Sequence, residues 1–476
     1  MARGAIVGFQ RGLACLSNRH TSGGFGSWRS DSGGDCGFSG ESSPGAAGGT
    51  IPAMSLVRRL KDQEVTAALA LLGAGGGTHR SRGSWDHDRM TAIVLGDAEK
   101  LDALMPLARR TIRAAPGRTL ELGWLSSNQF ASRMSWRRQT RESETHWAAL
   151  LPEVDALLVM RREERALLGG GGGAARWYRQ TGFAEVLSIR CLYLDMEAGV
   201  SKAERSAPAT RYHMQVVDPA EKSWEAGRWQ EEMAAVYGDV YAACGGAVAR
   251  GNDFWAGTLA HHFYRDHYQF QILGLWSAPP AAGNATLAGY ALVGWSGWHS
   301  KRPRMDILEL ATRQWDSGVA GELIAATCQL AQSKSVSQVR AVISVHDPYR
   351  GHLARIGFVD RWGYAMLAKW LHAQRYLDRL GETLPRELGD FWIQLNAPGE
   401  LPLTLGRGTR SAPANSIVLH SDAATRSRLL LNRVDLPGAL QDGTLVAAAP
   451  LSDGDVARLS LCFPWTPWVF HMVDYI

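Results

Sequence analysis

The sequence has little of what marks several common protein classes. Its six cysteines are scattered over 476 residues, with no pair spaced as metal ligands or as a disulfide framework. No run of about 18 uncharged apolar residues occurs, so no transmembrane helix is expected. The excess of basic over acidic residues is only +5, which argues against a nucleic-acid binder and a polybasic membrane protein.

Core-forming residues are plentiful. Hydrophobic residues make up 45% of the chain and charged residues 20%. At about 100–200 residues per domain, the length corresponds to two to four domains. Together these values predict a reduced, multidomain globular protein.

The N-terminal segment differs in kind from the rest. Residues 1–50 contain 13 glycines, and residues 1–30 contain four arginines and no acid. A segment so poor in aliphatic residues cannot bury enough apolar surface to fold, so residues 1–55 are predicted to be a disordered extension. The Arg- and Ser-rich start is also typical of an organellar transit peptide, which leaves an organelle open beside the expected cytoplasmic location. A wrongly chosen start codon is a further alternative.

Three compositional blocks follow, at residues 56–205, 206–372 and 373–476. Hydrophobic spacing in the first block predicts the following elements: a strand then a helix over 90–112, a strand at 154–160, a short helix at 174–183 and a strand at 185–196. In the second block it predicts a helix (224–246), three strands (268–276, 286–298, 304–313), a long helix (319–334), a strand (339–345), and a short helix leading into a strand (352–361).

The third block has predicted strands at 391–397 and 416–421 and ends in FPWTPWVFHMVDYI (463–476). Most chains end in a polar, frayed tail. A tail this aromatic is expected to dock against the rest of the protein.

A short motif occurs twice. ARWYRQTGF (175–183) and GHLARIGFV (351–359) each follow an apolar strand and precede another. Aligned on Gly-Phe, Tyr178 corresponds to Leu353. The repeat divides the first two blocks into two units of similar design.

With this motif and element order, the chain resembles the GNAT acetyltransferases. Two such units followed by a further domain resemble the Eis-type (enhanced intracellular survival) acetyltransferases, whose C-terminal domain is similar to sterol carrier proteins. The match to that domain rests on LLLNRVDLPGALQDG (429–443), VARLSLCFPW (456–465) and the aromatic end. The resemblance implies an α+β fold, with two GNAT-like mixed-sheet units plus a sterol-carrier-like α/β domain.

The resemblance also implies acetyl-CoA-dependent N-acetylation of a small-molecule amine. Tyr178 matches the tyrosine that protonates the leaving thiolate, although an amphipathic helix would also use it for packing. The base would be the chain's own terminal carboxylate, on Ile476, as in Eis-type enzymes. A terminal apolar plug is the alternative for this end.

The binding site for coenzyme A is harder to place. The glycine-rich cradle of the family has a partial copy in RQWDSGVA (313–320) and no clean copy in the first block. Backbone N–H groups of Gly170, Gly171 and Gly172 are the candidates to hold its phosphates, although a glycine run is also typical of a linker.

A second hypothesis is a catalytically inactive GNAT-like scaffold whose C-terminal domain binds an apolar ligand or a protein partner. No nucleic-acid partner and no metal is expected, and a homo-oligomer is left open. The histidines at 261, 262 and 267 lie on no common helical face, which argues against a metal site there.

Overall fold

The computed structural model describes the following residues: 57–66, 68, 90–96, 101–125, 147–162, 178–196, 211–218, 228–251, 269–296, 304–385, 388, 391–406 and 416–471. All of them belong to one compact unit, Met54–Ile476, and the other unit is Met1–Ala53. The predicted disordered extension at 1–55 therefore lies outside the described residues. No helix in the described ranges is both long and apolar enough to cross a membrane.

A mixed sheet runs through most of the described chain. Its strands, in chain order, are β1 (Val57–Arg59), β2 (Met90–Gly96), β3 (Leu101–Ala115), β4 (Arg118–Leu125), β5 (Ala156–Arg162), β6 (Ala184–Asp195), β7 (His213–Val217), β8 (Gln269–Trp276), β9 (Leu287–Ser296), β10 (Arg304–Thr312), β11 (Gln338–Ser344) and β12 (Val359–Trp370). Their order across the sheet is β1-β2-β3-β4-β5-β12-β6-β11-β10-β9-β8-β7.

The order has an approximate two-fold symmetry. β4 runs parallel to β5, and β10 runs parallel to β11, whereas the other neighbours are antiparallel. Each half of the sheet thus has the same pattern, three or more antiparallel strands followed by one parallel strand. The duplication predicted from the repeated motif is confirmed at the level of the sheet.

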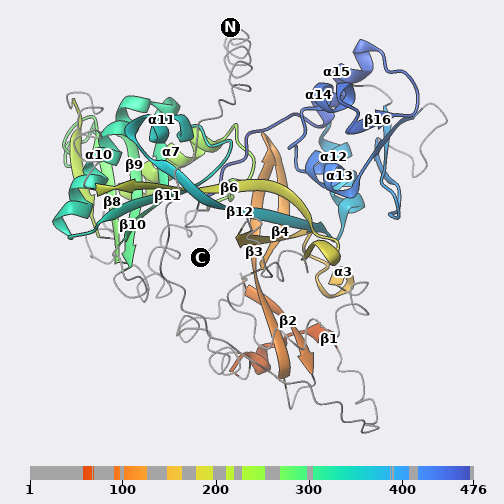
Figure 1. Ribbon diagram of the computed structural model, residues 1–476, viewed down its shortest axis with the longest axis horizontal. Helices are drawn as coiled ribbons and strands as arrows, with labels where there is room; N and C mark the ends of the chain where they lie inside the picture. Colours follow the sequence, from red (N-terminus) through yellow and green to blue (C-terminus); the bar gives the residue numbers. More distant parts are fainter. Residues whose placement is uncertain are drawn as a thin grey trace, which may run out of the picture. The chain divides into compact units, whose positions relative to one another are not determined.

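The final strands of the two halves are exchanged. β12, from the second half of the chain, lies between β5 and β6, and β6, from the first half, lies between β12 and β11. The β6–β12 register runs from Tyr193 opposite Val359 to Ala184 opposite Ala368, and the two strands lie side by side in Figure 1. Each half is therefore completed by a strand of the other. The predicted boundaries at 205 and 372 stay predictions.

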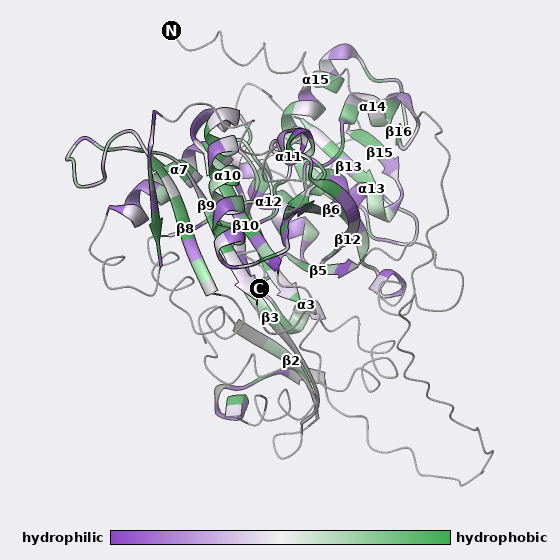
Figure 2. Ribbon diagram, turned by 60° about the vertical axis from the view of Figure 1, so that its left-hand side comes forward, coloured by the Kyte–Doolittle hydropathy of each residue, from purple (hydrophilic) through white to green (hydrophobic). Residues whose placement is uncertain are grey.

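Helices cover the second half in the order that the sequence predicted. They are α7 (Trp229–Tyr241), α10 (Ser317–Ser333) and α11 (Arg350–Ile356). α10 contacts β8, β9, β10 and β11, and its buried face includes Val319, Leu323 and Ile324. β9 beneath it is hydrophobic along most of its length (Figure 2). The alternation predicted for 224–361 is confirmed.

A second, smaller sheet lies in the C-terminal part, in the order β14-β13-β15-β16. Its strands are β13 (Trp392–Asn396), β14 (Leu403–Gly406), β15 (Ile417–Ser421) and β16 (Leu445–Ala447). Its helices are α12 (Ala373–Thr383), α13 (Ala423–Leu430), α14 (Leu436–Gln441) and α15 (Asp453–Cys462). The similarity of this part to sterol carrier proteins stays a prediction.

One predicted element is wrong. The helical spacing at 101–112 belongs to strand β3, which pairs with β2 on one side and β4 on the other. Thr111 donates a hydrogen bond to Glu121 across the β3–β4 pair, 2.9 Å from its Oε2. The backbone hydrogen bonds to β2 and β4 outweigh the helical spacing of apolar residues in this segment. Tertiary context commonly overrides such a local preference.

A buried carboxylate ties α12 to the start of β5. The Asp155 side chain is fully buried and accepts hydrogen bonds from Arg375 at 2.7 Å and Arg379 at 2.6 Å. It also accepts the backbone N–H of Glu121 at 3.0 Å. Burial alone would raise the pKa of Asp155, but these hydrogen bonds hold it below its usual value.

We expect Asp155→Asn to lower stability by about 1.5–3 kcal/mol, the usual contribution of hydrogen bonds to a charged group. The loss should shrink as the pH falls below about 4, where an unpaired Asp is protonated and the depressed pKa no longer contributes. Urea midpoints at pH 7 and at about pH 3 measure both effects. The exposed Asp378→Asn is the control and should leave the midpoint unchanged.

Candidate functional site

The two copies of the repeated motif have the same backbone geometry. In the first, the carbonyl of Tyr178 accepts the N–H of Phe183 at 3.0 Å, around Gly182 with φ of 83°. In the second, the carbonyl of Leu353 accepts the N–H of Phe358 at 3.0 Å, around Gly357 with φ of 115°. Glycine is required at both turns because an L side chain is strained there. Tyr178 and Leu353 are therefore structurally equivalent positions.

Tyr178 lies in the core of the first half with its hydroxyl bound to a cation. Its side chain is 1% exposed, and its hydroxyl oxygen accepts a hydrogen bond from Arg161 Nη2 at 2.8 Å. The Arg161 guanidinium also stacks on the ring, 4.6 Å from its centroid. Phe183 contacts the ring edge-on at 5.0 Å. The packing role considered for Tyr178 and a polar role of its hydroxyl thus coexist.

The carboxylate of Asp316 occupies the N-terminus of α10, where the partial glycine motif at 313–320 lies. The Asp316 carboxylate accepts the N–H groups of Gly318 at 2.8 Å and Val319 at 3.2 Å. These are the donors that a phosphate would use at a helix N-terminus. A pyrophosphate would also meet the repulsion of the Asp316 charge. The partial glycine motif at 313–320 therefore does not form a phosphate cradle.

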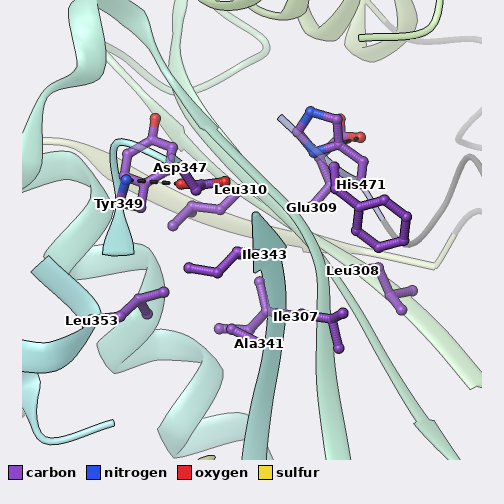
Figure 3. Close-up of a pocket in the computed structure, with 12 residues that line it drawn as sticks. Ile307, Leu308, Glu309, Leu310, Ala341, Ile343, Asp347, Tyr349, Leu353 and His471 are labelled. Carbon is purple, nitrogen blue, oxygen red and sulfur yellow. Dashed lines mark hydrogen bonds and ion pairs between the residues drawn. The ribbon is translucent and has the colours of Figure 1, made fainter. Parts of the chain in front are cut away.

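The cleft between the parallel strands of the second half is filled. Pairing of β10 with β11 ends at Ile307 and Ala341, next to an irregularity in β10 at Leu308. Beyond that point the strands are no longer paired, and Phe470 and His471 of the tail line the opening. Figure 3 shows His471 beside Glu309 there. Leu353 lines the same space. The remaining cavity is about 20 Å³, room for a water molecule and not for a cofactor.

A buried ionic network closes this cavity on one side. The Glu309 carboxylate accepts hydrogen bonds from Arg250 Nη1 at 2.8 Å and from the hydroxyl of Tyr290. His471 Nδ1 lies 3.8 Å from Glu309 Oε2. Burial alone would raise the pKa of Glu309, but Arg250 and its other partners hold it below its usual value. Glu309 is thus an ionised structural anchor.

Two further titratable groups line the cavity with few partners. Burial raises the pKa of Asp347 to about 7, although its Oδ1 accepts the N–H of Tyr349 at 2.8 Å. Burial lowers the pKa of His471 to about 4, and within the described ranges its Nε2 has no hydrogen-bond partner. Asp347 was not a predicted site residue, because it follows a strand and has the sequence of an ordinary turn. Glu309 and His471 were not predicted either, because their partners are distant in sequence.

The described part of the aromatic tail, up to His471, docks as the sequence predicted. Trp468 and Phe470 are 0% and 1% exposed. The tail forms a short parallel bridge in which Gly245 donates to Pro467 and accepts from Val469, each at 3.0 Å. Trp468 packs so closely on Gly245 that a Cβ there would clash with the indole ring. Trp465, in contrast, is 42% exposed.

Several predicted site residues lie outside the described part of the chain. They are the glycines Gly170, Gly171 and Gly172 and the terminal Ile476. The roles assigned to the glycines and to Ile476 stay predictions. Of the catalytic pair, the structure describes Tyr178 only.

Comparison with known proteins finds similarity in structure and not in sequence. No protein-family model and no curated protein matches the chain. A probable N-acyltransferase from Enterococcus faecalis is 13% identical, with a TM-score of 0.59 over 88% of this chain and 98% of that one. Eis1 from Mycobacterium abscessus is 13% identical, with a TM-score of 0.53 over 88% and 99%. A GCN5-related N-acetyltransferase from Kribbella flavida is 12% identical, with a TM-score of 0.53 over 88% and 100%.

The chain has an α+β fold built from two GNAT-like mixed-sheet units. It is similar to the Enterococcus, Mycobacterium and Kribbella proteins over nearly the full length of each. At 12–13% identity these likenesses establish the fold, and the chemistry depends on the side chains of this chain.

We expect Asp347→Asn to stabilise the protein more at pH 8 than at pH 5. An Asp whose pKa rises from about 3.9 unfolded to about 7 folded binds a proton on folding, so stability falls as the pH rises between these values. Asn removes this cost and still accepts the N–H of Tyr349. Thermal midpoints at the two pH values, with Asp378→Asn as control, measure the difference. An equal shift at both pH values would contradict the assignment.

Proposed function

We propose that the protein is an acetyl-CoA-dependent N-acetyltransferase that acts on an amine through its first GNAT-like unit. The amine nitrogen attacks the thioester carbonyl, the C–S bond breaks, and the products are an amide and coenzyme A. The ammonium form of the substrate must lose a proton and the thiolate must gain one. Tyr178 is proposed as the acid and the α-carboxylate of Ile476 as the base.

The observation that carries the proposal is the difference between the two equivalent motif positions. The first unit has a phenol at Tyr178, whereas the second has the aliphatic Leu353 in the same backbone setting. In the second unit Asp316 also occupies the helix N-terminus, and the tail fills the opening between β10 and β11. These features support chemistry in the first unit and a structural role for the second.

The surroundings of Tyr178 suit a proton donor. A phenol oxygen that accepts a hydrogen bond keeps its own O–H as a donor. The Arg161 cation, 2.8 Å from that oxygen, would stabilise the phenolate left after proton transfer. The ring is fixed by Phe183 and by the turn at Gly182, so that the hydroxyl is held in one direction.

The docked tail supports a role for the terminal carboxylate. The tail is buried at Trp468, Val469 and Phe470, each at most 1% exposed. This burial fixes the chain as far as His471, five residues before the terminal Ile476. A free α-carboxylate has a pKa of about 3.3–3.7, so it would need burial to serve as a base. An anchored tail can supply such burial, whereas a frayed one cannot.

Calorimetric titration of the full chain with acetyl-CoA tests the proposal directly. Binding in the micromolar range, followed by release of free thiol with an amine panel, is the expected result. Absence of both binding and turnover at millimolar acetyl-CoA would instead support the inactive scaffold, and the search would move to apolar ligands of the C-terminal part.

We expect Tyr178→Phe to lower kcat by about 100- to 10,000-fold with little change in KM, because a general acid acts mainly in the transition state. Phe retains the ring packing and removes only the hydroxyl. Leu353→Met changes the equivalent position of the second unit and should leave kcat within about twofold. Thiol release at saturating amine measures both, and equal rates in the two variants would refute the assignment.

We expect two glycines appended after Ile476 to abolish turnover, because they move the carboxylate by up to about 7 Å at 3.3–3.6 Å per residue. The same two glycines inserted after Met1 are the control and should have no effect. Near-ultraviolet circular dichroism checks that Trp468 stays docked. Turnover at the unmodified rate with the extended terminus would show that the terminal carboxylate is not the base.

A further inference from the structure

Two arginines are held side by side at the end of α13 by a backbone hydrogen bond. The N–H of Arg433 donates to the carbonyl of Arg428 at 2.8 Å, and Asn432 between them has φ of 58°. This arrangement closes the helix C-terminus and fixes both residues at one end of α13. The two guanidinium groups affect each other, because Arg428 contributes to lowering the pKa of Arg433.

The hydrogen-bond donors of these arginines are only partly used. Arg433 Nη1 donates to the carbonyl of Thr466 at 2.9 Å, and Arg428 Nη2 donates to Thr425 Oγ1 at 3.0 Å. The Nε of each is buried and has no hydrogen-bond partner among the described residues. In the part of the chain that the structure describes, neither arginine makes an ion pair with a carboxylate. Burial, above all, lowers the pKa of Arg433 to about 10.

Three further side chains lie near these arginines: His346 between β11 and α11, Arg350 at the start of α11, and Trp465 in the tail after α15. Burial lowers the pKa of His346 to about 4, and Arg433 and Arg350 act in the same direction, so these groups lie close to one another. The ring of His346 contacts the half-exposed ring of Trp465, with centroids 5.8 Å apart. We call Arg350, Arg428, Arg433, His346 and Trp465 the basic cluster.

The cluster is short of negative charge. Among the described residues, the carboxylate that pairs with one of its arginines is Asp360, 3.8 Å from Arg350, and Asp360 already accepts two hydrogen bonds from Arg190 Nε and Nη2 at 2.9 Å. The carbonyl ends of α13 offer at most about half a negative charge, and they leave the Nε donors unused. A buried cation without a counter-charge is costly, so the arrangement favours an anion from solution.

We propose that the basic cluster is a binding site for a small phosphorylated molecule, whose phosphate group is bound by Arg428 and Arg433. Planar guanidinium groups match phosphate oxygens in pairs. Trp465 offers an exposed ring on which a base or another planar group can stack. The site lies apart from Tyr178 and does not depend on the proposed acetyl transfer.

Titration calorimetry of the full chain with inorganic phosphate and with ADP tests the site, in buffer without other oxyanions. Phosphate should bind, and Arg433→Gln should lower the affinity for phosphate at least tenfold. Arg458→Gln, an exposed arginine on α15, is the matched control and should leave the affinity unchanged. If Arg433→Gln is insoluble, Arg428→Gln replaces it, because that side chain is also a proposed ligand.

Further titrations separate the contribution of the phosphate group from that of the base. ADP should bind more tightly than phosphate, and Trp465→Ala should remove only that advantage. Acetyl-CoA carries phosphates too, so Arg433→Gln should keep any binding that belongs to the first unit. No binding of phosphate or ADP at 10 mM, or equal losses in Arg433→Gln and Arg458→Gln, would overturn the proposal, and the arginines would then serve only to bind helix-end carbonyls.

Discussion

Two strands that each complete the opposite half of the sheet hold this chain together. β12 fills the place beside β5 that the first half leaves open, and β6 fills the corresponding place beside β11. Each of the three pairings among the central four strands, β5–β12, β12–β6 and β6–β11, therefore joins the two halves. The relative positions of Tyr178 on one side and the β10–β11 opening on the other follow from this exchange.

The same backbone design supports different chemistry in the two halves. The turns at Gly182 and Gly357 are alike, but one positions a phenol beside Arg161 and the other an aliphatic side chain in a filled cavity. In the second half the parallel strands are no longer paired beyond Ile307 and Ala341. The tail and the Glu309 network occupy the gap, so the fold's opening has become an internal anchor for the C-terminus.

Much of the fold could be predicted because its signals are local. The Gly-Phe repeat identified the duplication, and the apolar runs identified β5, β6 and the strands and helices of the second half. The strand β3 was mistaken for a helix because its partners β2 and β4 decide its conformation, and a single segment does not show them. The exchange of β6 and β12 left no trace in the pattern, since either pairing order buries the same faces.

For the candidate site too, the sequence revealed local signals and not those that depend on distant partners. Tyr178 was found because its motif is contiguous. Asp347, Glu309 and His471 were missed because their perturbation comes from burial and from partners such as Arg250 that are far away in sequence. Arg428 and Arg433 carry no sequence signal, since two arginines in a helix end are ordinary on a surface and unusual only when their Nε atoms are buried.

The strand exchange also bears on how the chain can be made by a ribosome. β6 ends at Asp195, but its neighbour β12 begins only at Val359. At about 5–20 residues per second, the nascent first half waits on the order of ten seconds with the edges of β5 and β6 unpaired. Unpaired edges of this kind pair readily with strands of other chains. During this interval of translation, the incomplete sheet would need a chaperone to prevent aggregation.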